Sequence, residues 1–221
     1  MKRRLRGVGH IHAIVPLNVL SKSKVRLSRV LKPIERKQLT VAMLKDVLSA
    51  LRKAKSIHSV TVVSADPTAR RICRRYGASF LWEGKRRGLN KGVKLAVSNS
   101  KRRGASSVLV IHSDLPLLKP QEIELFLKQS QGYSVALTPS KDRDGTNALL
   151  MTPPDVIRTV FGKDSFRKHL RLAGQRNARS KVLRFKGISF DVDKPRDLVH
   201  LMREPLRNET GRFLQAFRKQ G

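Results

Sequence analysis

The chain alternates short apolar runs with longer amphipathic stretches, and this alternation limits the folds that it can adopt. Short apolar runs bounded by turn residues predict buried strands, whereas an apolar stripe with helical spacing predicts a surface helix. The predicted strands span residues 10–15, 60–64, 78–82, 107–112, 133–138, 147–151, 182–185 and 188–192. The predicted helices span residues 33–53, 89–99, 121–129 and 165–173, with one more that starts after Asp66-Pro67 and stops at Gly77. Strand–helix units followed by extra strands indicate an α/β protein, a three-layer α/β/α sandwich with a mostly parallel sheet.

The length of 221 residues with 39% hydrophobic residues is enough for one substantial core, and nothing like a Pro/Gly/Ser linker divides the chain. We therefore expect a single domain over residues 1–221, with a basic N-terminal arm over 1–9 and a basic C-terminal helix over 203–221. That helix would place its apolar residues at a subunit contact, which predicts a homodimer; they are Leu206, Phe213, Leu214 and Phe217. The single cysteine, Cys73, excludes an internal disulfide. No apolar stretch approaches the roughly 20 residues of a membrane span, so we expect no membrane partner and a cytoplasmic location.

The charge of the chain is strongly positive, with 48 Lys and Arg residues against 16 Asp and Glu residues and a net charge of +32. Such a field attracts polyanions, which include both nucleotides and nucleic acids. Nucleic-acid binding is not favoured, because aromatic residues make up only 5% and no aromatic stacking motif or zinc-finger spacing is present. Against this background, the few carboxylates are informative.

Three aspartates stand where strands are predicted to end. Asp191 and Asp193 alternate with apolar neighbours in the predicted strand 188–192 and its extension, so both would project to one face. Asp114 follows the apolar run of the central predicted strand. Ligands of open α/β sheets bind at the carboxyl ends of strands, so the three acids suggest Mg²⁺ and a phosphorylated substrate. The alternative is that Asp193 caps the helix entered at Pro195, as Asp66 would cap the helix entered at Pro67.

Several loops could bind anions. Residues 16–27 form a basic loop after the first predicted strand, with Lys22, Lys24 and Arg26 but without the Walker signature of a P-loop enzyme. A solvated basic loop is the alternative. Three further segments with small or hydroxyl-bearing residues could cradle a phosphate or simply start an element; they are Gly88-Leu89-Asn90, Gly145-Thr146-Asn147 and residues 161–166.

Together, these segments carry a family resemblance. The order PLNVLSKSKVRLS, VVSAD, GLN, SDLPLL, GTNALL, FGKDSF and FDVDKPRDL resembles the 2-phospho-L-lactate guanylyltransferase family of coenzyme F-420 biosynthesis, whose close relatives act on phosphoenolpyruvate. The resemblance runs from about His12 to Leu201. It implies the nucleotide-diphospho-sugar transferase (GT-A-like) fold. It also implies an enzyme that joins the phosphate of 2-phospho-L-lactate, or of phosphoenolpyruvate, to GMP from GTP and releases pyrophosphate.

The resemblance also implies roles for individual residues. Asp114, Asp191 and Asp193 would bind Mg²⁺. The phosphorylated three-carbon acid would contact Thr146, Gly162 and Ser165, and the catalytic cations on the GTP triphosphate would be Lys24 and Arg26. The base or ribose would contact Gly88 and Asn90. The chain departs from the family at Asn18, where relatives commonly have Lys, and at Lys91-Gly92, where a glycine early in a helix could alter base selection.

The expected reaction needs no general base, because its nucleophile is an acceptor phosphate that is already anionic at neutral pH. What must be overcome is repulsion between anions, which Mg²⁺, Lys and Arg can offset. Two alternatives stay open. One is a sibling nucleotidyltransferase acting on a molybdopterin or sugar-phosphate acceptor, although its glycine-rich loop is absent between Pro16 and Leu27. The other is a basic nucleic-acid-binding protein. His112 reads more simply as a structural residue than as part of the site.

Overall fold

The fold is described from a computed structural model, which covers residues 9–84 and 88–219. The predicted basic arm, apart from Gly9, lies outside the described residues. Within them, no helix is long and apolar enough to cross a membrane.

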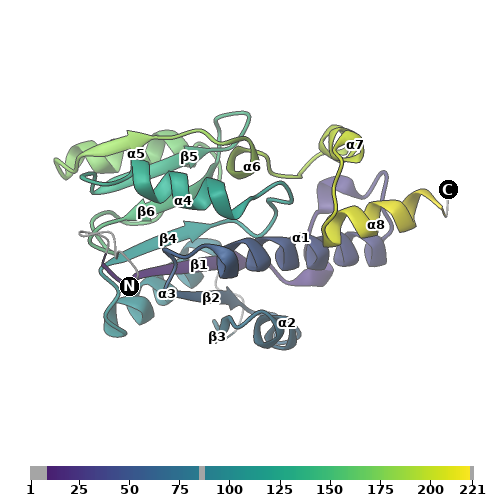
Figure 1. Cartoon of the computed structure of the whole chain (residues 1–221), viewed down its shortest axis with the longest axis horizontal. Helices are drawn as coiled ribbons and strands as arrows, with labels where there is room; N and C mark the ends of the chain where they lie inside the picture. Colours follow the sequence, from purple (N-terminus) through teal and green to yellow (C-terminus); the bar gives the residue numbers. More distant parts are fainter. Residues whose placement is uncertain (1–8, 85–87, 220–221) are drawn as a thin grey trace.

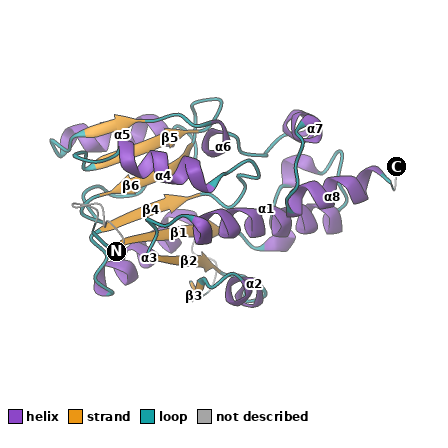
Figure 2. Ribbon diagram, in the orientation of Figure 1, coloured by secondary structure: helices purple, strands orange, loops and turns teal. Residues whose placement is uncertain are grey.

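One sheet with seven strands contains every described strand, in the order β3-β2-β1-β4-β6-β5-β7 (Figure 2). The strands are β1 (Ile11–Leu17), β2 (Ser59–Ser64), β3 (Ser79–Trp82), β4 (Ser107–Ile111), β5 (Val135–Pro139), β6 (Thr146–Met151) and β7 (Ser180–Val182). Strand β6 runs antiparallel to both of its neighbours, and all other pairs are parallel. The predicted mostly parallel sheet is therefore confirmed. Because β6 is reversed, its first residues lie at the same edge as the carboxyl ends of β1 and β4.

Helices cover both faces of this sheet, as the prediction of a three-layer sandwich requires (Figure 1). Apolar side chains of α1 (Pro33–Lys53), α2 (Ala69–Arg75), α4 (Pro120–Gln129) and α6 (Lys186–Ser189) share one core with the sheet. Those of α3 (Leu89–Arg102) and α5 (Ser165–Gln175) share a second core on the opposite face. Strand residues alternate between the two cores, since Ala13 and Val15 belong to the first and Ile14 to the second.

A third core lies beyond the end of the sheet. It joins α7 (Pro195–Arg203) and α8 (Glu209–Arg218) to the first turns of α1 and to the loop after β1, which contains the short 3₁₀ turns η1 (Leu20–Lys22) and η2 (Val25–Leu27) (Figure 1). Leu214 of α8 is buried here beside Leu39 and Met43 of α1. The predicted C-terminal helix is therefore shorter than 203–221, and its apolar residues pack against their own chain.

A repeated local sequence starts three of the helices. Each begins with a Lys-Pro pair, and an acid stands two residues after the proline; the pairs are Lys32-Pro33, Lys119-Pro120 and Lys194-Pro195. The acid accepts a hydrogen bond from the backbone N–H of the lysine. Proline suits the first helical position because its missing N–H would have no intrahelical partner, and the acid satisfies a free donor of the first turn. In α7 that acid is Asp197. Asp193 is therefore not the cap of this helix.

The predicted strand over residues 188–192 is wrong. Residues Lys186–Ser189 form the helical turn α6, and the chain then runs extended from Phe190 outside any sheet. The N–H of Gly187 donates to Glu122 Oε1 at 2.9 Å, and the N–H of Val192 donates to the Asp114 carbonyl at 3.3 Å. These tertiary contacts favour a turn over the strand that the short alternating pattern predicted. They also hold the segment against the loop after β4.

Candidate functional site

The carboxyl ends of β1 and β4 and the start of β6 meet at one edge of the sheet, and the predicted site residues gather there. Lys24 lies at the centre of their charged part, between η1 and η2. Its Nζ lies 2.5 Å from Asp114 Oδ2 and 2.7 Å from Asp193 Oδ1, and Arg26 Nη1 lies 3.8 Å from Asp193 Oδ2. The sheet thus brings together two of the predicted acids and both of the predicted cations.

Lys24 reaches this position through an unusual backbone. Its φ of 54° lies in the left-handed region, which costs energy for a residue with a side chain. The side chain is only 8% exposed. Burial by itself would lower the pKa of Lys24, but Asp114 and Asp193 outweigh it and raise the pKa. Burial would likewise raise the pKa of Asp114, but Lys24 holds it below its usual range. The pair is therefore charged at neutral pH.

Asp191 completes the group of acids, and its carboxylate forms no ion pair with any described lysine or arginine, although the charge of Lys141 acts on it. Its Oδ1 accepts a hydrogen bond from Asn147 Nδ2 at 3.3 Å. Burial, followed by the negative charge of Asp114, raises the pKa of Asp191. Asp114 Oδ1 is buried and has no hydrogen-bond partner among the described residues. Acids that repel each other beside an unsatisfied carboxylate oxygen are suited to an added cation. However, no three ligating side chains in residues 9–84 and 88–219 are arranged to hold an ion together in this structure.

A second, less charged part of the site surrounds Thr146 and Ser165. Thr146 Oγ1 lies 3.0 Å from Nδ1 of His169, whose side chain is fully buried. Ser165 begins α5, and its buried Oγ has no hydrogen-bond partner in the described part of the chain. Gly162, just before α5, has a φ of 116°, which residues with side chains rarely adopt. The three residues predicted to hold an acceptor therefore form one neighbourhood.

His112 links the two parts. It lines the same cavity as Lys24 and Asp114, and its ring lies 5.4 Å from that of Phe161, the residue before Gly162. Its buried Nε2 has no hydrogen-bond partner among the described residues. Buried polar atoms are normally paired, so the unpaired atoms of His112, Asp114 and Ser165 mark a place for a polar ligand. Sequence reasoning set His112 aside, although its position two residues before Asp114 was a usable signal.

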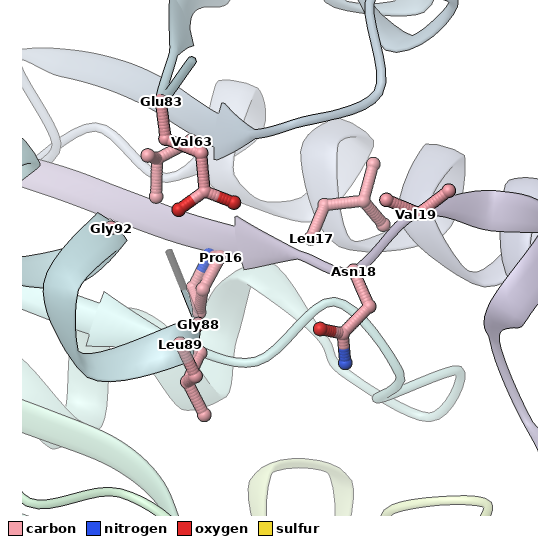
Figure 3. Close-up of a pocket in the computed structure, with 9 residues that line it drawn as sticks. All are labelled: Pro16, Leu17, Asn18, Val19, Val63, Glu83, Gly88, Leu89 and Gly92. Carbon is pink, nitrogen blue, oxygen red and sulfur yellow. The ribbon is translucent and has the colours of Figure 1, made fainter. Parts of the chain in front are cut away.

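Two adjoining hollows lie at this edge of the sheet, and Lys24 lines the larger one. A cavity of about 250 Å³ is lined by the basic loop and the acids, including Asn18, Lys22, Lys24, Asp114 and Asp193. A narrow slot continues from it past Leu17, Asn18 and Leu89, and is lined by Gly88, Val63, Glu83 and Gly92 as well (Figure 3). The space inside the slot measures about 10 Å³, which is room for about one water molecule.

Gly92 and Glu83 are neighbours in the lining of the slot (Figure 3). A Cβ at position 92 would lie 2.5 Å from Glu83 Oε2, closer than real contacts allow. The glycine that departs from the family pattern therefore makes room for a carboxylate. Sequence reasoning found the glycine but assigned no role to Glu83.

Asn90 is placed differently from the expectation that it contacts a base or ribose. Its Nδ2 donates to the Phe161 carbonyl at 3.0 Å, and its Oδ1 accepts from the Phe161 N–H at 2.7 Å. The amide thus fastens the start of α3 to the loop that carries Gly162. Gly88, by contrast, lines the slot. Contact of either residue with a nucleotide stays a prediction.

Comparisons with known proteins agree on one family. The model of the family described as "Guanylyl transferase CofC like" matches residues 11–220. A phosphoenolpyruvate guanylyltransferase of Sphaerobacter thermophilus is 38% identical over 86% of this chain and 91% of its own. A 3-phospho-D-glycerate guanylyltransferase of Colwellia psychrerythraea is 34% identical over 92% and 97%, and a 2-phospho-L-lactate guanylyltransferase of Methanobrevibacter smithii is 30% identical over 94% and 91%.

A solved structure supports the fold. A protein of Desulfovibrio desulfuricans, described as a nucleotide-diphospho-sugar transferase, superposes with a TM-score of 0.76 at 19% identity and covers 93% of this chain and 94% of its own. The predicted nucleotidyltransferase fold is confirmed.

Proposed function

This chain belongs to the CofC-like guanylyl transferase family, and from that premise we propose that it transfers GMP from GTP to the phosphate of a phosphorylated three-carbon acid. The acceptor phosphate oxygen attacks the α-phosphorus of GTP, a new P–O–P bond forms, and pyrophosphate leaves with the electrons of the broken bond. Membership of this family sets aside the sibling transferases and a purely nucleic-acid-binding role.

The observation that carries the proposal is the contact between the charged and the hydroxyl-lined parts of the site. Asn147 follows Thr146 on β6, and its side chain donates to Asp191 at 3.3 Å. His112 joins the two parts, since it lines the cavity with Lys24 and Asp114 and its ring lies 5.4 Å from that of Phe161. An acceptor held beside Gly162 would therefore present its phosphate toward the acids and Lys24. A triphosphate in the 250 Å³ cavity would meet the same residues from the other side. Such proximity of two anionic reactants is what the reaction requires.

We assign the cations of the basic loop to the triphosphate. Lys24 would bind an oxygen on the α-phosphate, where charge develops during attack, and Arg26 would contact the departing pyrophosphate. Arg26 is suited to a partner that leaves, because its side chain is 72% exposed and its ionic contact with Asp193, at 3.8 Å, is loose. The base would lie at the mouth of the slot beside Gly88, with one edge toward Glu83.

We also propose Mg²⁺ as the cofactor, held by Asp114, Asp191 and Asp193. The unpaired Asp114 Oδ1 and the raised pKa of Asp191 support this assignment. Mg²⁺ bound there would offset negative charge on the phosphates. Because the Lys24 ammonium lies between Asp114 and Asp193, it would exchange its carboxylate partners for phosphate oxygens when nucleotide and ion bind.

The acceptor is one of three related acids, because the relatives named above act on phosphoenolpyruvate, 2-phospho-L-lactate and 3-phospho-D-glycerate. All three share a carboxylate and a phosphate, which Thr146, Gly162 and Ser165 would receive. GTP as the nucleotide rests on the family, and a cytoplasmic location rests on the sequence alone. A homodimer stays part of the proposal, although the apolar residues that suggested a subunit contact pack within their own chain.

Pyrophosphate release tests the function. The protein is incubated with GTP and Mg²⁺ and with each of the three acids or none, and the guanylylated product is identified by mass. We expect release with one acceptor only, and a loss of about a hundredfold or more in kcat for Asp114→Asn. Glu204→Gln, which changes an acid in the loop after α7, serves as the matched control and should keep full activity. Folded protein that releases no pyrophosphate with any of the three acids would refute the proposal.

A further inference from the structure

His169 is a buried residue that contacts Thr146, one of the residues predicted to hold the acceptor. It lies one helical turn after Ser165 on α5 and is fully buried. Its Nδ1 lies 3.0 Å from Thr146 Oγ1, and its Nε2 accepts a hydrogen bond from the Val160 N–H at 3.0 Å. The ring also packs edge-on against Phe161, with centroids 5.0 Å apart. From α5, His169 therefore contacts both β6 and the loop between β6 and α5.

The partner of Nε2 fixes the proton on the ring. A backbone N–H can only donate, so Nε2 must be the nitrogen without a proton. A neutral imidazole then carries its proton on Nδ1, and burial keeps the ring neutral by lowering its pKa to about 4. Nδ1–H must therefore donate to Thr146 Oγ1.

This hydrogen bond fixes the orientation of the Thr146 hydroxyl. Once Oγ1 accepts from His169, its own hydrogen is turned away from the ring and is available as a donor. We propose that His169 is a positioning residue that holds the Thr146 hydroxyl as a hydrogen-bond donor toward the anionic acceptor. This inference rests on the proposed function, since it assumes that Thr146 meets a phosphorylated acid.

The chemistry of the acceptor fits this arrangement. Carboxylates and phosphates offer only acceptor oxygens at neutral pH, so a hydroxyl that is free to rotate would spend part of its time in an unproductive orientation. A hydroxyl oriented in advance avoids that cost on binding. Ser165, whose buried Oγ has no partner among the described residues, could donate from the adjoining side. The pocket would then favour an oxyanion over a neutral group of the same shape.

The simpler reading is that His169 only ties β6 to the loop at Val160. Two substitutions separate the readings, because each amide copies one nitrogen of the ring. His169→Asn places an N–H near the Nδ1 position, so it keeps the donor to Thr146 and loses the bond from Val160. His169→Gln places an oxygen near the Nε2 position, so it keeps the bond from Val160 and loses the donor.

Steady-state kinetics with the preferred acceptor provide the test. We expect His169→Gln to raise the KM of the acceptor about tenfold and to leave the KM of GTP within about twofold, whereas His169→Asn stays close to wild type for both. Thr146→Val should raise the KM of the acceptor similarly, and adding His169→Gln to it should bring no further loss, because the two residues act through one hydroxyl. Equal losses in both histidine variants, or effects that multiply in the double variant, would overturn the proposal.

A second measurement does not depend on turnover. ¹⁵N NMR of histidine-labelled wild-type protein, with the His169 signals assigned by comparison with His169→Asn, should show protonated Nδ1 and unprotonated Nε2. The opposite tautomer would overturn the proposal even if the enzyme is active. Conversely, a wild-type protein that shows the expected tautomer but uses none of the three acids would refute the proposed function and not the ring geometry.

Discussion

His169 shows at the scale of one residue how burial couples the site to pH. The pKa of its ring is lowered from 6.5 to about 4 by burial and by the nearby His112. Below pH 6.5 the unfolded chain therefore binds a proton that the folded protein does not, and stability falls as the pH falls from 6.5 toward 4. The full difference corresponds to about 3 kcal/mol in the free energy of unfolding. Urea unfolding at a series of pH values measures it.

The comparison with His169→Asn isolates this contribution from those of other groups. The carboxylates titrate in both proteins, and so does His12, a second histidine whose pKa is lowered by burial. Their contributions to the free energy of unfolding cancel in the difference between the two proteins. The variant should be less stable at pH 7 but should lose less stability on acidification. Parallel stability curves for the two proteins between pH 7 and 4 would show that the pKa of His169 is not lowered.

Single residues also show where sequence reasoning succeeds. The position of Asp114 follows from the end of β4, because strand ends of one sheet share an edge. Asp193 arrives by another route, since its segment lies outside the sheet and is joined to the Asp114 carbonyl by the N–H of Val192. The contact of both with Lys24 does not follow, since it depends on a left-handed backbone at a residue with a side chain. The sequence analysis assigned Asn90 to the nucleotide, and its hydrogen bonds to the Phe161 backbone could not be predicted for a similar reason. Its partner, Phe161, is distant in sequence and belongs to a loop without a periodic pattern.

At the scale of elements, α8 depends on one buried carboxylate. Asp46 of α1 accepts hydrogen bonds from the N–H groups of Glu209 and Thr210, both at 2.9 Å, and from Thr210 Oγ1 at 2.5 Å. It thereby satisfies free donors in the first turn of α8. Asp46→Ala should lower the free energy of unfolding by about 2 kcal/mol. Hydrogen exchange should show lost protection in α8 while the central strands stay protected.

Asp155→Ala is the matched control, because its carboxylate is exposed and pairs only with Lys101 in the described structure. Exposed pairs contribute little, so its stability should change by less than about 1 kcal/mol. If Asp46→Ala unfolds α8 and the sheet together, α8 belongs to the same cooperative unit as the main fold. The prediction of separate loss would then be wrong.

The third core explains why these terminal helices matter for the site. Leu27 follows Arg26 and Val192 stands between Asp191 and Asp193, and both side chains are buried in this core. Packing of α7 and α8 therefore anchors the basic loop and the acidic segment together. Sequence periodicity predicted α1 with its bounds. It also predicted a strand at 188–192, but this segment is held by the buried side chain of Val192 and pairs with no strand of the sheet.

At the scale of the whole molecule, the net charge of +32 acts on substrates that are themselves polyanions. GTP and a phosphorylated acid must be drawn into one site against their mutual repulsion. A positive field raises their local concentration and their association rate, and salt screens it. This predicts that kcat/KM for GTP falls by about tenfold or more between 50 mM and 500 mM NaCl. The salt dependence of kcat itself should be weaker, because a bound substrate would contact buried groups such as Lys24, where salt screens less.

A charge-reversal variant away from the site distinguishes capture from direct contact. Arg71, Arg74 and Arg75 of α2 are exposed and line none of the hollows described above. Replacing all three by Glu lowers the net charge by about six, since each change removes one positive and adds one negative charge. Compared with wild type, the variant should show a lower kcat/KM for GTP at low salt and the same kcat/KM at high salt, so its salt dependence is shallower. Tm is measured over the same salt range to show that both proteins stay folded. If the two proteins keep a constant ratio of kcat/KM at every salt concentration, the charge excess does not capture substrate and must serve another purpose.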